Sequence, residues 1–310
     1  MYRLGDHRDA AKLSNEKPST WRSPARSVCG FLLGIAVLFV CGTARAQVLY
    51  VSQGVRNTRI VSTYNATTGA VLSSSLIAGL KAPFGLAMNS NSNPPVIFVA
   101  DAGDNVIGEY NATNGSAINQ AFIQYTKPFF LLLSGTTLYV ARSGGTEVDT
   151  YATTGTKIKV PFISGIGRIG GLTVSGNVLY VSDQNAGKVD EYDASTGVLN
   201  TSFLVAGSFP NGLAVYGNDI FVAQLGPLGA LLRGRISKCT LTGTLIDPNF
   251  ITPGISVLYN LLLSGSTLYI VEESSPGTIG EYNAATGVPT GGFITGRLFP
   301  FGLAISSLQK

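Results

Sequence analysis

Charged residues are scarce in this chain. Only 12% of its 310 residues are Asp, Glu, Lys or Arg, whereas 45% are hydrophobic. Intrinsic disorder is excluded, because disordered chains combine high charge with low hydrophobicity. Methionine and tryptophan are also rare, while glycine (38) and tyrosine (13) are abundant. Since long helices are rich in Ala, Glu, Lys, Leu and Met, this composition favours turn-rich β structure.

Histidine and cysteine are almost absent beyond residue 46. The one histidine, His7, and two of the three cysteines, Cys29 and Cys41, precede that point, which leaves Cys239 alone. Residues 47–310 therefore have no imidazole for metal binding or for base catalysis near neutral pH, and no internal disulfide. They also contain no GxSxG, P-loop or Cys-x-x-Cys motif.

The first 46 residues carry the whole net charge, with seven of the 21 Lys and Arg and three of the 17 Asp and Glu. A basic stretch is followed by an apolar run over residues 28–41 and by Ala44-Arg45-Ala46. This pattern predicts a signal peptide over residues 1–46 and a secreted or periplasmic protein. The run is shorter than the roughly 20 residues of a membrane-spanning helix. The alternative is an uncleaved N-terminal anchor, which would be the only membrane attachment.

An internal repeat is the main signal in residues 47–310. A turn-like motif, typified by Tyr64-Asn-Ala-Thr-Thr-Gly69, recurs with starts at residues 64, 110, 151, 192, 239 and 282. The copy at Cys239 is degenerate. Each unit contains four short apolar segments bounded by Gly, Asn, Asp and Ser, which are typical of strands. In the motif, Asn or Asp is expected to start a hairpin turn and Gly to close it with a positive φ.

The polarity of the segments predicts their positions. The first two strands of each unit are apolar on both faces and are expected to be buried, whereas the third and fourth alternate like half-exposed outer strands. After residue 46, the first predicted strand is a second strand at Leu49, with no first strand ahead of it. The last predicted strand, residues 301–305, is a first strand with no second strand after it. We therefore expect an all-β fold, a six-bladed β-propeller of four-stranded antiparallel blades, closed by the C-terminal strand completing the N-terminal blade. An open β-solenoid is the alternative, but it would not explain why one unit is divided between the two ends of the repeat region.

The pattern of Gly-Leu-Ala in a first strand, then Leu-Tyr-Val-Ser-Asp (residues 179–183) and then Lys-Val-Asp-Glu-Tyr-Asp (residues 188–193) resembles NHL-type repeats. The resemblance extends over residues 47–310 to the wider group of gluconolactonase-like, strictosidine-synthase-like and streptogramin-lyase-like six-bladed propellers. It implies that a ligand binds at one mouth of a central channel.

The same resemblance places two sets of residues around that mouth. The first-strand rim residues begin each first strand, and the second-strand rim residues end each second strand. The first-strand rim residues are Phe84, Phe129, Gly170, Asn211, Tyr259 and Phe301. The second-strand rim residues are Gln53, Asp101, Arg142, Asp183, Gln224 and Glu272.

These rims supply nine candidate ligand-binding residues: Asn211, Arg142, Glu272, Asp101, Asp183, Tyr259, Phe84, Phe129 and Phe301. The aromatic residues either form a collar over a pocket or fill the tapering channel. Asp101 and Asp183 either face a ligand or bond the backbone amides of blade turns. Arg142 and Glu272 depart from that turn pattern, which makes them the better functional candidates.

The sequence offers little for catalysis. Lyases of this fold depend on histidine, which residues 47–310 lack. Pro210-Asn211-Gly212-Leu213 matches one metal-binding Asn motif of gluconolactonase-like enzymes, but Phe84 and Phe129 stand where further ligands would be needed. We therefore expect a non-catalytic ligand- or protein-binding module without a cofactor. The alternative is a metal-dependent lactonase or esterase, with Ca²⁺ or Zn²⁺ held by Asn211 and Glu272.

The expected partners are a small molecule, a glycan or an extracytoplasmic protein, bound by a monomer. Residues 47–310 hold equal numbers of acidic and basic residues and no basic cluster, which argues against nucleic acid. One segment, residues 224–235, breaks the repeat with an apolar loop ending in two arginines. It is either a lid or docking loop on the side of the channel mouth, or an insertion of no consequence.

Overall fold

The computed structural model describes residues 47–54, 58–142, 144–205, 209–225, 234–253, 257–273, 277–291, 294–297 and 299–306. The chain divides into two units, residues 1–43 and 44–310, and only the second is described below. The predicted signal peptide lies outside the described residues. Within those residues, no helix has the length and apolar character needed to cross a membrane.

The described residues form six four-stranded antiparallel sheets, which we call blades 1 to 6 and give from the innermost strand outward. Blade 1 holds β24 (Pro300–Ile305), β1 (Val48–Gln53), β2 (Ile60–Asn65) and β3 (Val71–Ile77); blade 2 holds β4 (Pro83–Asn89), β5 (Val96–Asp101), β6 (Val106–Asn111) and β7 (Ala117–Gln124). Blade 3 holds β8 (Pro128–Ser134), β9 (Thr137–Arg142), β10 (Val148–Ala152) and β11 (Lys157–Ile163); blade 4 holds β12 (Ile169–Ser175), β13 (Val178–Asp183), β14 (Lys188–Asp193) and β15 (Leu199–Leu204). Blade 5 holds β16 (Pro210–Tyr216), β17 (Asp219–Gln224), β18 (Arg235–Thr240) and β19 (Leu245–Ile251); blade 6 holds β20 (Val257–Ser264), β21 (Thr267–Glu273), β22 (Gly277–Asn283) and β23 (Ile294–Arg297).

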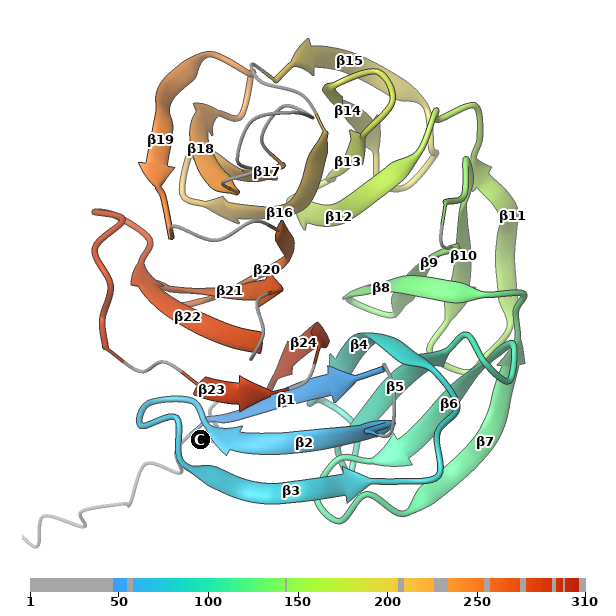
Figure 1. Cartoon of the computed structure of the whole chain (residues 1–310). Helices are drawn as coiled ribbons and strands as arrows, with labels where there is room; N and C mark the ends of the chain where they lie inside the picture. Colours follow the sequence, from blue (N-terminus) through green and yellow to red (C-terminus); the bar gives the residue numbers. More distant parts are fainter. Residues whose placement is uncertain are drawn as a thin grey trace, which may run out of the picture. The chain divides into compact units, whose positions relative to one another are not determined.

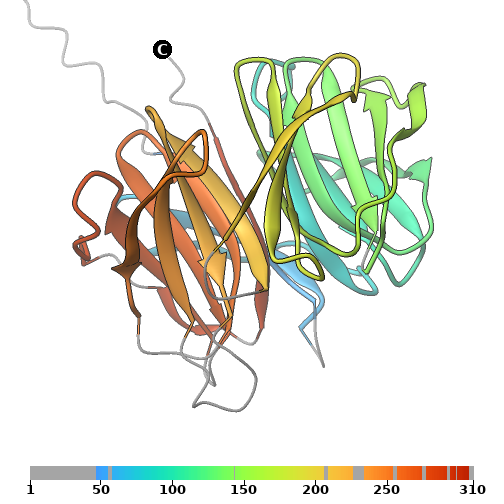
Figure 2. The ribbon, with the colours of Figure 1, turned by 90° about the horizontal axis from the view of Figure 1, so that it is seen from above.

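The six blades close into a ring. Their innermost strands contact one another in the order β24, β4, β8, β12, β16, β20, and β20 contacts β24 again (Figure 1). The C-terminal β24 pairs with β1 through Leu49 with Ile305, Tyr50 with Ala304 and Val51 with Leu303. The predicted six-bladed β-propeller, including the closure of the N-terminal blade by the C-terminal strand, is therefore confirmed. Figure 2 shows the same blades seen from above.

The repeated motif forms the hairpin turn between the third and fourth strands. In blade 1, Asn65 Oδ1 accepts hydrogen bonds from the backbone amides of Thr67 (2.9 Å) and Thr68 (3.0 Å), and Gly69 has a φ of 67°. The same arrangement recurs at Asn111, Asp193 and Asn283. The predicted roles of Asn, Asp and Gly in these turns are confirmed.

The same turns join neighbouring blades. The tyrosine hydroxyl of three second strands donates to the alanine carbonyl of the motif in the next blade: Tyr50 to Ala112, Tyr139 to Ala194 and Tyr269 to Ala66, at 2.7–2.9 Å. The tyrosine that opens each motif is buried, as is Cys239 in its place in blade 5. The hydrophobic core consists of clusters between adjacent blades, such as the one that packs Val61 and Ile77 of blade 1 against Ile97 and Val99 of blade 2.

A glycine lies third in four of the six innermost strands, which we call the glycine position. A Cβ at Gly171 would lie 2.6 Å from the Asn211 carbonyl oxygen of the next blade, and one at Gly212 would lie 2.9 Å from that of Tyr259. Gly85 and Gly302 face the next blade in the same way. Real Cβ atoms do not approach so closely, so glycine lets the inner strands pack tightly.

Blades 3 and 6 depart from this pattern. Aligned by register, the glycine position holds Phe130 in blade 3 and Asn260 in blade 6. Correspondingly, β8 packs less closely on β12, and β20 on β24, than the inner strands do at the four glycine junctions. The ring therefore has two junctions of a different kind, opposite each other.

The burial of the strands differs from the expectation in two respects: the third strands are more buried, and the first strands less buried, than the sequence predicted. Second and third strands such as β5 and β10 are almost completely buried, whereas the first strands are partly exposed, as in β8. The third strands are covered by neighbouring blades on both faces, and the first strands border the channel. The exposed fourth strands, such as β7, match the expectation.

Candidate functional site in the central channel

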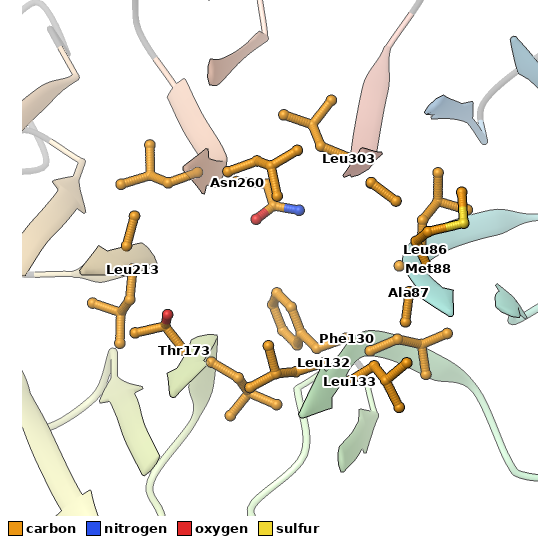
Figure 3. A pocket seen from close by; sticks show the side chains of 18 of the residues that line it. Leu86, Ala87, Met88, Phe130, Leu132, Leu133, Thr173, Leu213, Asn260 and Leu303 are labelled. Atoms are coloured by element: carbon orange, nitrogen blue, oxygen red, sulfur yellow. The ribbon is translucent and has the colours of Figure 1, made fainter. Parts of the chain in front are cut away.

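The innermost strands of all six blades enclose a cavity of about 370 Å³ (Figure 3). Its wall is mainly aliphatic, with Leu132, Leu172, Leu213, Leu262 and Leu303 among the lining residues. The polar lining side chains are Thr173, Asn260 and Tyr259, and none of the lining residues is charged. The lining side chains are therefore mainly apolar, although polar atoms contribute almost as much of the lining surface as apolar atoms do.

The aromatic first-strand rim residues meet at one end of this cavity. The ring centroids of Phe84 and Phe129 are 4.4 Å apart, those of Phe84 and Phe301 are 4.9 Å apart, and those of Tyr259 and Phe301 are 5.2 Å apart. Such distances are typical of aromatic side chains in direct contact. Four of the nine candidates thus line the cavity. They pack against one another across the channel, as expected for side chains that fill it.

Asn211 is buried and bonded within the protein. Its Oδ1 accepts a hydrogen bond from Gln184 Nε2, and its Nδ2 donates to the Leu258 carbonyl oxygen of blade 6 at 3.0 Å. Gln184 occupies the space beside Gly170, where a Cβ would lie 2.9 Å from Gln184 Cγ. Asn211 therefore links blades 4, 5 and 6, and it is not among the residues that line the cavity.

Asp101 and Asp183 bond the backbone of blade turns. The Asp101 carboxylate accepts from the amides of Lys81 (2.8 Å), Ala82 (2.7 Å) and Gly103 (3.2 Å). Asp183 accepts from the amides of Gly167 (2.8 Å) and Asn185 (3.1 Å), among others. Of the two interpretations that the sequence left open, this geometry favours the structural one, because the carboxylates satisfy buried amides.

Arg142 lies at the end of β9 with its side chain 43% exposed. Its Nη2 is 3.8 Å from Glu147 Oε2, and its guanidinium carbon is 5.7 Å from the centroid of the Tyr125 ring. An exposed pair at that distance contributes little stability. The Nε of Arg142 is buried without a hydrogen-bond partner. Arg142 therefore retains hydrogen-bonding capacity, but it lies outside the lining of the cavity.

Glu272 is 5% exposed at the end of β21. Its Oε1 accepts a hydrogen bond from the Tyr282 hydroxyl at 3.3 Å. Burial raises the pKa of Glu272 to about 7, and the hydrogen bond from Tyr282 opposes that rise. A carboxyl with such a pKa can exchange a proton near neutral pH. Glu272 does not line the cavity, however, so its carboxyl group would not contact a molecule bound there.

The side chains of Asn211 and Glu272 do not fit the Ca²⁺ or Zn²⁺ site that was the alternative prediction from the sequence. Within the described residues there is no group of three or more His, Cys, Asp or Glu side chains that could hold a metal ion. The amide of Asn211 is bonded to Gln184 and to the Leu258 carbonyl, and Glu272 is bonded to Tyr282. A hard cation needs six or more oxygen ligands, which this pair does not provide.

The structure adds three residues that the sequence reasoning missed. Figure 3 shows Phe130, Thr173 and Asn260 projecting into the cavity from β8, β12 and β20. Two of them gave a signal in the sequence, because Phe130 and Asn260 replace the glycine of the other four blades.

The apolar loop at residues 224–235, interpreted from the sequence as either a lid or docking loop or an insertion of no consequence, lies largely outside the described residues. Its two ends are described, and there Arg235 Nε donates to Gln224 Oε1 at 2.8 Å.

No protein-family model and no curated protein matches this chain. Solved structures do match it. A chain in the crystal structure of the nidogen/laminin complex has a TM-score of 0.65 at 14% identity, and the match covers 85% of this chain and 100% of that one. A chain of hydrazine synthase from Kuenenia stuttgartiensis has a TM-score of 0.51 at 13% identity over 67% of each chain. At such identities the likeness shows the fold alone, that of a six-bladed β-propeller.

Proposed function

We propose that this chain is an exported β-propeller that binds a ligand without transforming it. The observation that carries the proposal is the separation of the acidic side chains and of Asn211 from the cavity. Asp101, Asp183, Asn211 and Glu272 are all bonded within the protein, and none lines the cavity. Catalysis would need such groups beside the reacting molecule.

Export is part of this proposal, and the pattern of residues 1–46 supports it. A binding role also agrees with the nidogen/laminin structure, since that structure is a complex of two proteins. The ligand of this chain is a small molecule, a glycan or an extracytoplasmic protein, and it binds to a monomer that needs no cofactor. The resemblance to NHL-type and gluconolactonase-like propellers belongs to the same proposal.

The purified protein tests this function in two parallel assays. Calorimetry against panels of small apolar molecules, glycans and extracytoplasmic proteins is expected to find a saturable ligand. Incubation with a panel of lactones and esters is expected to show no turnover above a boiled control. Turnover that a chelator abolishes would contradict the proposal and favour the metal-dependent hydrolase.

A further inference from the structure

We propose that the central cavity binds an uncharged, mainly hydrocarbon molecule with one hydrogen-bonding group, such as a hydroxyl or carbonyl. Phe130 packs against the hydrocarbon part and Asn260 bonds the polar group. This inference rests on the proposed binding function and names its site and the class of ligand.

The argument begins with the glycine position. Glycine there allows one blade to approach the carbonyl of the next, as at Gly171 and Gly212. A side chain at this position is absent from four blades; in blade 3, part of Phe130 packs on the cluster between blades 3 and 4 and on the Phe129 ring, 4.8 Å away between centroids. Blades 3 and 6 carry Phe130 and Asn260 instead, and both side chains project into the cavity (Figure 3).

Asn260 is the polar group best placed for a ligand. In the described part of the chain, its amide has one hydrogen-bond partner, the Phe301 carbonyl oxygen, at the long distance of 3.4 Å. Within the same residues its carbonyl oxygen has none, and most of the neighbouring lining side chains are aliphatic. A polar group facing an apolar cavity costs free energy unless it finds a partner, so a ligand that supplies one gains affinity. The Thr173 hydroxyl, on another strand of the same wall, offers a second hydrogen-bonding group.

The remaining lining sets the character of the ligand. Because no charged residue lines the cavity, an ionic ligand would lose its hydration without gaining a partner. Aliphatic side chains and the Phe130 ring favour hydrocarbon. The volume of about 370 Å³ lies near the lower end of the roughly 300–1,000 Å³ of small-molecule pockets, which favours a small ligand.

Competition binding tests the inference. The fluorescent probe is N-phenyl-1-naphthylamine, and the competitors are n-octane, 1-octanol and 2-octanone, which share a chain length. With the wild-type protein, the alcohol and the ketone are expected to displace the probe about five- to tenfold more strongly than the alkane, as one hydrogen bond allows.

Three variants locate the site. Asn260→Leu keeps the size of the side chain and is expected to bind the alcohol and the ketone more weakly than the alkane, because their polar group then loses its partner. Phe130→Gly restores the glycine of the other blades and is expected to weaken all of them. Asn200→Leu changes an exposed asparagine on β15 and is expected to behave like the wild type. Thermal unfolding checks that each variant is folded. If Phe130→Gly does not fold, the test rests on Asn260→Leu alone.

The outcomes separate this inference from the proposed function. If the probe binds but Asn260→Leu retains the preference for the alcohol, the inference is wrong. It is also wrong if no probe binds while calorimetry finds a saturable glycan or protein ligand, and the proposed binding function then stands. If no ligand of any kind is found, both fail.

Discussion

At the scale of single residues, blade 6 contains two buried carboxyl groups. Burial raises the pKa of both Glu272 and Glu281 to about 7, from an ordinary value near 4.5. Glu281 Oε1 is buried without a hydrogen-bond partner. Folding therefore favours the protonated form of each group, because the ionised form loses its hydration.

The pH dependence of stability follows from this shift. Because folding raises both pKa values, protonation of these two carboxyl groups stabilises the folded state. This contribution to the free energy of unfolding is complete below about pH 4.5 and is lost as the pH rises through about 7. Glu272→Gln and Glu281→Gln are each expected to remove part of this dependence. At pH 8.5 each variant should exceed the wild type by on the order of 1–3 kcal/mol in free energy of unfolding, and at pH 4.5 they should not. Urea unfolding across this range measures the effect, and an unchanged slope in both variants would contradict it.

The individual residues also show where prediction from the sequence ends. The predicted alignment of the units agrees with the strand register. Each second-strand rim residue pairs with the residue that precedes a first-strand rim residue, as Asp101 pairs with Pro83, which precedes Phe84. The sequence could not show that Asn211 bonds Gln184 and the Leu258 carbonyl, because these partners lie in neighbouring blades. Nor could it show that Glu272 meets Tyr282. The contacts of Asn211 depend on how closely one blade approaches the next, and the contact of Glu272 with Tyr282 depends on side-chain packing within blade 6.

At the scale of elements, the spacing of the inner strands depends on the glycine position. Gly212→Ala places a Cβ 2.9 Å from both the Tyr259 carbonyl oxygen and the Leu261 amide nitrogen. It is expected to lower the free energy of unfolding by about 1–3 kcal/mol, because backbone must move. Asn260→Ala is the matched control, since its position in blade 6 already holds a side chain, and it should cost about 1 kcal/mol or less. Equal effects of the two changes on denaturant midpoints would contradict this account.

The elements themselves were predictable, because each unit repeats the same local signals. The turn residues, the split unit and the four strands of each blade followed from the motif and its spacing. The exceptions are the third strand, which was expected to be half-exposed, and the first strand, which was expected to be buried on both faces. Its exposure depends on the channel, and a channel is a property of the closed ring that no single unit contains.

At the scale of the whole molecule, the six blades are equivalent enough that a blade other than blade 1 could hold the two ends of the chain. In blade 4, the first two strands are joined by the exposed turn Gly176-Asn177. In blade 1 the corresponding strands are β24 and β1, where Val48 N and Ser306 Oγ lie 2.9 Å apart. A short glycine-containing turn can therefore connect residue 306 to residue 47.

A circular permutant tests this equivalence. The variant joins residues 306 and 47 and opens the chain between Gly176 and Asn177, so that blade 4 becomes the split blade. It is expected to fold with a melting temperature within about 5 °C of the unpermuted residues 47–306, because every blade keeps its four strands. A second permutant opened between Val181 and Ser182, inside β13, should fail to fold. Circular dichroism during heating distinguishes the two, and equal behaviour would contradict the ring topology.

The pairing of β24 with β1 also has a consequence during biosynthesis. Translation produces β1 long before β24, so blade 1 is the last of the six blades to be completed. Until then its inner edge can hydrogen-bond to other chains. The ring therefore cannot close until β24 has been synthesised, and five complete blades precede the one that closes it.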